Sequence, residues 1–270
     1  HPMAALDAHR IAPYLLRFYA SVSNPNAGVL NEAIMETLIN QIVWPRGALA
    51  RVAAVAKKHG KSTSRSRDDD AYGLLVESNN DPIDLQVLPE NPVDKKLAML
   101  GDFKTGLKLL YVDDPAWLRA VLNHTLLEAQ ARQDKADGLM WARLQQVGEV
   151  FGWSPVELQL ARIAMHASEL PDCADWLDTL PNVQRDAARA YKRVLGGDSA
   201  MLRSCTQPGS ALANSGLFIV DRPHNGPLGF SDPPHLNSKL MTALAMPDFD
   251  VGQLAQFLFS KSPDSTLCDD

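Results

Sequence analysis

The residues with the most recognisable chemistry are Gly60, Lys61 and Ser62, the last three letters of a phosphate-binding loop. That loop has the pattern Gly-x-x-x-x-Gly-Lys-Ser/Thr and follows a buried strand, so that backbone N–H groups surround the phosphates. Here Val55 occupies the first glycine position, and residues 47–58 are rich in alanine with apolar residues at helical spacing. We therefore predict a helix with Gly60 as its C-cap, and no phosphate loop.

A second candidate is a basic helix face within the predicted helix 183–195. Its members are spaced i, i+4, i+7 and i+8, which places them on one side of that helix; they are Arg185, Arg189, Lys192 and Arg193. The helix is third in a predicted winged-helix order, the position of a DNA-recognition helix. These residues would then contact phosphates. The alternative is a solvated face paired with nearby carboxylates, which the acidic chain and Asp186 favour.

An apolar stripe near the N-terminus is a candidate surface for a protein partner. It consists of Leu30, Ile34, Leu38 and Ile42, each four residues after the last. A helix with such a stripe binds a groove or packs inward. The alternative is that the stripe packs against the helix predicted to begin at Pro115.

Other polar clusters lack the geometry that catalysis or metal binding needs. His166 and Ser168 are two residues apart on a predicted helix and so point to different sides, without a Gly-x-Ser-x-Gly elbow. The run 68–70 is all aspartate but lacks the turn glycine and distal glutamate of a calcium loop. His224 and His235 flank a Pro/Gly loop without further ligands. We predict no catalytic residue, no metal site and no cofactor in this chain.

Composition limits the class of protein. The chain has 270 residues, of which 46% are apolar, enough for a substantial core. Its net charge of −6 argues against extensive coating by nucleic acid, although a local basic patch stays possible. The three cysteines form no CxxC pair, which indicates reduced thiols and a cytoplasmic location. No apolar run reaches the roughly 20 residues of a membrane-spanning helix, so no membrane partner is expected.

The predicted fold is mainly α with a small β component. Residues 4–135 are expected to form a helical region with a short hairpin or sheet and a flexible linker near 61–71. Residues 91–112 fit either a helix or a strand. Residues 138–260 are expected to form a winged-helix-like domain, and 261–270 the start of a linker to a missing module.

Four short motifs at helix starts, turns and a strand in the second half of the chain resemble those of a known family. From about Leu139 to Asp270 it resembles the region that precedes the ATPase module in bacterial AAA+ ATPases. The motifs are a helix start, an acidic-Leu turn, a strand that leads into a wing, and an Asp-Phe-Asp turn; they occupy residues 151–157, 169–172, 215–221 and 248–250. Trp153 replaces the leucine usual in the first motif.

The resemblance implies a recognition role for this chain. Such regions are non-catalytic and recruit a protein substrate or adaptor to the motor. ATP and Mg²⁺ would bind the missing module, which would also form the oligomer. The hypothesis from another class is a winged-helix DNA-binding protein that uses helix 183–195.

Overall fold

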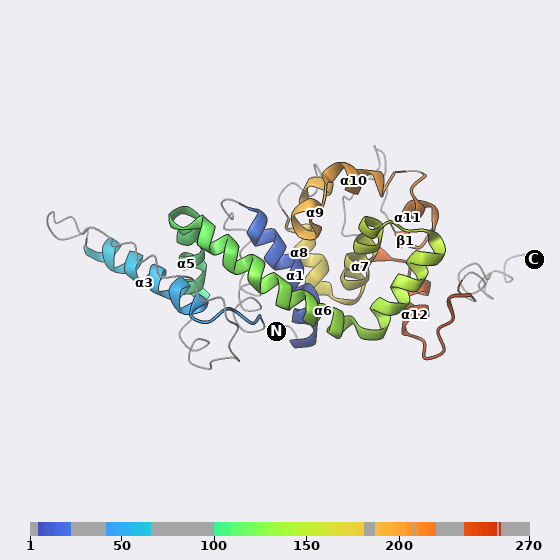
Figure 1. Ribbon diagram of the computed structural model, residues 1–270, viewed down its shortest axis with the longest axis horizontal. Helices are drawn as coiled ribbons and strands as arrows, with labels where there is room; N and C mark the ends of the chain where they lie inside the picture. Colours follow the sequence, from blue (N-terminus) through green and yellow to red (C-terminus); the bar gives the residue numbers. More distant parts are fainter. Residues whose placement is uncertain are drawn as a thin grey trace, which may run out of the picture. The chain divides into compact units, whose positions relative to one another are not determined.

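The structure is a computed structural model that describes seven stretches of the chain. They are residues 5–22, 42–65, 100–180, 187–207, 209–219, 235–252 and 254. These residues are mainly helical, which confirms the predicted fold class at that level (Figure 1). The strands predicted within residues 73–88 lie outside the described residues. The chain divides into two compact units, His1–Ala136 (unit 1) and Asp137–Asp270 (unit 2).

The described residues of unit 1 form four helical segments. They are α1 (Ala5–Ser21), α3 (Ala48–Arg65), α5 (Leu100–Asp113) and the first part of α6 (Pro115–Phe151). The helix α5 settles the ambiguity of residues 91–112 in favour of a helix from Leu100 onward. The core of unit 1 is aliphatic and aromatic. Its fully buried side chains include Tyr14, Phe18, Tyr19 and Phe103.

The helices α3 and α5 pack at very short range. A Cβ atom added to Gly106 of α5 would lie only 1.9 Å from the carbonyl oxygen of Val52 in α3. Glycine is therefore the residue that permits this approach. Arg51 of α3 also reaches the start of α6, where it pairs with the Asp114 carboxylate at 2.6 Å and covers the Trp117 ring.

The helix α3 ends later than the sequence suggests. It continues to Arg65, so the expected C-cap at Gly60 is wrong. The first residues of the linker expected near 61–71 are helical as well. Glycine costs about 1 kcal/mol relative to alanine within a helix, a penalty that the alanine-rich first half offsets. Gly60, Lys61 and Ser62 thus lie inside a helix and not in a loop after a strand.

Unit 2 begins with the second part of α6, after a break at Gly138, whose φ of 49° and ψ of −122° are not helical. The further elements among its described residues are α7 (Pro155–Glu169), α8 (Pro171–Asp178), α9 (Ala187–Leu195), α10 (Ser199–Ser204), α11 (Ala211–Asn214), β1 (Phe218–Ile219), β2 (His235–Leu236) and α12 (Ser238–Ala245). The two strands pair antiparallel, with Phe218 opposite Leu236.

The helix α7 lies at the centre of unit 2. Most of its side chains are buried, including Leu160, Ile163 and Met165. Ser168 near its end joins it to β2, because the Ser168 hydroxyl accepts a hydrogen bond from the Leu236 N–H at 3.0 Å. This polar contact fixes the strand pair against the helical core.

The three tryptophans of unit 2 differ in burial. Trp153 and Trp176 are buried, whereas Trp141 is half-buried and stacks against the Arg162 guanidinium at 4.2 Å. No helix among the described residues has the length and apolar character to span a membrane.

Candidate functional site

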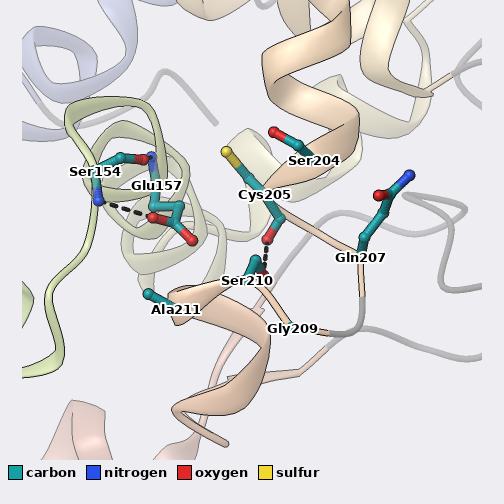
Figure 2. Close-up of a pocket in the computed structure, with 8 residues that line it drawn as sticks. All are labelled: Ser154, Glu157, Ser204, Cys205, Gln207, Gly209, Ser210 and Ala211. Atoms are coloured by element: carbon teal, nitrogen blue, oxygen red, sulfur yellow. Dashed lines mark hydrogen bonds between the residues drawn. The ribbon is translucent and has the colours of Figure 1, made fainter.

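A polar pocket of about 470 Å³ opens in unit 2 beside the start of α7 (Figure 2). It is lined by Ser154, Glu157, Ser204, Cys205, Gln207, Gly209, Ser210 and Ala211. These residues come from the start of α7, the end of α10 and the loop that leads into α11. The sequence did not predict this pocket, because the start of α7 lies about 50 residues before the end of α10 and the loop that follows it.

The carboxylate of Glu157 is the charged group of the pocket lining, and it forms part of a capping box. It accepts a hydrogen bond from the Ser154 N–H at 2.8 Å, and the Ser154 hydroxyl accepts one from the Glu157 N–H at 3.3 Å (Figure 2). The two bonds form a capping box, the arrangement that a serine and a glutamate three residues apart favour at a helix start. The other carboxylate oxygen accepts from the Leu212 N–H at 2.9 Å. Glu157 is therefore committed to backbone donors of two helices.

The thiol of Cys205 also lines the pocket but is not activated. It donates a hydrogen bond to the Met201 carbonyl at 3.0 Å. Burial raises its pKa, and the nearby negative charge of Glu157 raises the pKa further. A reactive cysteine needs the opposite, a cationic neighbour that favours the thiolate. The pocket thus offers hydroxyls, an amide and a carboxylate to a polar ligand, and a protonated thiol.

A buried ionic cluster joins α6 to α7 elsewhere in unit 2. The Asp137 carboxylate accepts from Arg162, whose nearest nitrogen is 2.6 Å away, and contacts the His166 Nε2 at 2.8 Å. Burial alone would raise the pKa of Asp137. Hydrogen bonds and charges from His166 and Arg162 outweigh that effect, so the pKa is lowered.

This cluster has the features of a buried structural contact between two helices. The His166 side chain is 0% exposed, and its ring reaches an aspartate 29 residues earlier. Sequence reasoning considered His166 with Ser168, but the two side chains have different partners, since Ser168 bonds to Ala164 and Leu236. Asp137 escaped notice because nothing local in the sequence marks an acidic residue as buried.

The structure describes three members of the predicted basic face. On α9, Arg189 and Lys192 are exposed and Arg193 is half-buried, while the opposite side with Ala190, Tyr191 and Val194 is buried. The fourth member, Arg185, lies outside the described residues. Whether this face binds nucleic acid stays a prediction.

The predicted apolar stripe is described at one position only. Ile42 is 6% exposed and therefore packs inward. The other three members, Leu30, Ile34 and Leu38, lie outside the described residues. The partner-binding role of the stripe stays a prediction.

Metal ligands do not gather in the described part of the chain. No group of three His, Cys, Asp or Glu residues with suitable spacing occurs there. His235 lies in β2 and is half-buried, whereas His224 and residues 68–70 lie outside the described ranges.

Comparisons with protein-family models, curated proteins and solved structures find no match to this chain. The resemblance to AAA+ N-terminal regions therefore depends on the sequence motifs alone.

Proposed function

We propose that this chain is a non-catalytic recognition region that recruits a protein partner to an AAA+ motor. The motor, which would bind ATP and Mg²⁺, would be a separate module encoded after residue 270 of the same polypeptide. Unit 2 supports a winged-helix-like domain: α7, α8 and α9 precede the antiparallel pair β1–β2, and α12 follows. The short helices α10 and α11 are additions to that order.

The observation that carries the proposal is that the motif residues 151–157 join the helices of unit 2. Gly152 has a φ of 66°, which lets α6 end sharply before the cap of α7. Trp153 is buried and stacks on Phe151. Glu157 joins α7 to α11. The motif residues that carry the resemblance thus lie where α6, α7 and α11 meet.

A second motif of the resemblance has a similar structural use. The Phe249 ring of the Asp-Phe-Asp turn lies 5.3 Å from the guanidinium carbon of Arg143. Arg143 is buried and donates to the carbonyl oxygens of Leu244 and Pro247 at 2.6 and 3.1 Å. The turn after α12 is therefore anchored to α6.

The second part of α6 offers a surface for a protein partner. Leu139 and Val150 are 63% and 62% exposed, although both are large and apolar. They are eleven residues apart, three helical turns, and so lie on one side of the helix. Ala142 and Gln146 are exposed between them. An uncharged exposed helix side of this kind is typical of an interaction surface.

Two experiments test the proposal. The coding sequence after residue 270 should contain a strand followed by Gly-x-x-x-x-Gly-Lys-Ser/Thr within about a hundred residues, as a phosphate loop requires. A stop codon soon after residue 270 would overturn the proposal that the chain belongs to a motor protein.

A photo-crosslinking residue at position 139 or 150 of the full protein should capture one common protein. The same residue at the exposed position Gln145, on another side of α6, is the matched control. Equal capture at all three positions would overturn the docking surface.

A second candidate function is DNA binding through α9. The observation that favours it is the exposure of Arg189 and Lys192 on a helix without acidic residues. Replacing both with alanine should lower the affinity for DNA and the slope of its salt dependence by about 1 for each charge removed. An unchanged slope would remove this candidate.

A further inference from the structure

The pocket beside the start of α7 is large enough for a small organic molecule. Its volume of about 470 Å³ lies within the range of about 300–1,000 Å³ that is typical of ligand pockets. The structure describes all eight of its lining residues, and no aromatic or large aliphatic side chain is among them (Figure 2). A ligand in this pocket would therefore be recognised by charge and hydrogen bonds.

Three lining side chains already use their hydrogen atoms within the protein. The Ser204 hydroxyl and the Cys205 thiol donate to the Met201 carbonyl oxygen at 2.7 and 3.0 Å. The Ser210 hydroxyl donates to the Cys205 carbonyl oxygen at 2.6 Å. A serine hydroxyl has one hydrogen atom and two lone pairs. Ser204 and Ser210 can therefore offer a ligand acceptors but no donor.

The carboxylate of Glu157 adds negative charge to this set of acceptors. One of its oxygens accepts from the Ser154 N–H and the other from the Leu212 N–H. An ionised carboxylate has about four lone-pair sites, so each oxygen can accept a further bond. Glu157 is 5% exposed, and electrostatic attraction is stronger where bulk water is excluded. No lysine, arginine or histidine is among the lining residues.

We propose that this pocket binds an organic cation through its ammonium or guanidinium group. Such a group carries three to five N–H donors and no acceptor, which complements the lone pairs of Glu157, Ser204 and Ser210. Its bonds to the carboxylate are charge-assisted and therefore roughly twice as strong as neutral ones. A free amine and the lysine or arginine side chain of a peptide both carry this group. The inference does not rest on the partner surface of α6.

Other classes of ligand fit the lining less well. A phosphate or carboxylate ligand would be repelled by Glu157 and would find no cationic side chain in the lining. A neutral polyol has acceptor oxygens that need protein donors, whereas Ser204, Cys205 and Ser210 have already used theirs. A metal ion prefers several carboxylates or imidazoles, and the described residues contain no group of three potential ligands.

An NMR titration of the full chain with agmatine tests the proposal, because agmatine carries a guanidinium at one end and an ammonium at the other. The backbone amides of Gly209 and Ala211, which line the pocket, should shift and saturate. Butanediol and succinate, a neutral and an anionic molecule of similar length, should shift them little. Blocked Gly-Gly-Arg-Gly-Gly, with Gly-Gly-Gln-Gly-Gly as its control, is the second arm. Saturation by the arginine peptide assigns the pocket to a side chain of a partner, and saturation by agmatine alone assigns it to a free amine.

Charge variants at Gln207 test the same point without touching the helix cap of α7. Gln207 is exposed and lines the pocket. Gln207→Glu should strengthen agmatine binding about two- to fivefold and Gln207→Lys should weaken it by a similar factor, the effect of one exposed charge pair. The same two substitutions at Gln145, exposed on α6 and outside the lining, are the matched control and should leave the affinity unchanged.

Glu157→Gln keeps the size of the side chain and removes its charge. It should weaken agmatine binding about tenfold or more, as expected for the loss of a hydrogen bond to a charged group. If this variant loses its fold, the Gln207 variants decide the question. Three outcomes would overturn the proposal: no saturable shift with agmatine or the arginine peptide, equal shifts with succinate, or one affinity for the glutamate and lysine variants at position 207.

Discussion

The Glu157 carboxylate and the Leu212 backbone N–H form a 2.9 Å hydrogen bond across 55 residues of sequence. The same carboxylate accepts from the Ser154 N–H. One buried side chain thus satisfies donors near the starts of α7 and α11, and it forms one wall of the pocket next to Cys205. Charge-assisted bonds of this kind are roughly twice as strong as neutral ones.

Replacing Glu157 with alanine should destabilise unit 2 by about 2–4 kcal/mol. The variant loses a helix cap, worth about 1 kcal/mol, and leaves the buried Leu212 N–H without an acceptor, which costs about 1–3 kcal/mol more. Hydrogen exchange of α7 amides would measure the change. Glu149→Ala, at an exposed position of α6, is the control and should change stability by less than about 0.5 kcal/mol. Equal protection in both variants would contradict the structural role of Glu157.

The capping box shows what the sequence can predict. Ser154 and Glu157 are three residues apart, and their reciprocal bonds depend on local geometry alone, so the spacing suffices. The bond to Leu212 and the Asp137–His166 contact depend on how distant segments meet. Residue spacing carries no information about contacts between distant segments, so the sequence predicted neither of these two contacts.

The end of α3 shows where local rules fail. A glycine after an alanine-rich run, followed by serines and charges, has the pattern of a helix end. The helix nevertheless continues for five residues past Gly60. Stop signals of this kind are worth about 1 kcal/mol each, and the propagation of an established helix can outweigh them.

The Asp137 cluster should make unit 2 sensitive to acid. The pKa of Asp137 is lower in the folded chain than in the unfolded chain. Its contribution to stability is therefore present above the unfolded value, about pH 4, and is lost as the pH falls through the lower folded value. Asp137→Asn should remove this pH dependence. It should also cost about 3–5 kcal/mol at neutral pH, because removing one member of a buried charged pair is strongly destabilising. The free energy of unfolding measured between pH 7 and pH 2 tests both points, and a variant with the parent's acid profile would contradict them.

Gly106→Ala should destabilise unit 1, although alanine normally stabilises a helix by up to about 1 kcal/mol relative to glycine. The reason is the 1.9 Å distance between the added Cβ and the Val52 carbonyl oxygen, which forces α3 and α5 apart. Overpacking of this kind costs about 1–3 kcal/mol or more. Thr105→Ala, one residue earlier and exposed, is the control and should be neutral or slightly stabilising. Urea denaturation of both variants gives the sign, and a stabilising Gly106→Ala would show that the helices do not approach this closely.

Both described cysteines should react slowly with thiol reagents in the folded chain. Burial raises the pKa of Cys173 to about 12, and the charge of Asp172 adds to this effect. Burial and Glu157 raise the pKa of Cys205. The thiolate is the reacting form, so at pH 8 each side chain should label far more slowly than in urea. A Cys268→Ser background restricts labelling by Ellman's reagent to these two residues. Fast labelling of Cys205 in the native state would contradict this account, because it would require a thiolate stabilised inside the pocket. The Cys205→Ser variant would then identify the reacting site, and the pocket would become a candidate for covalent chemistry.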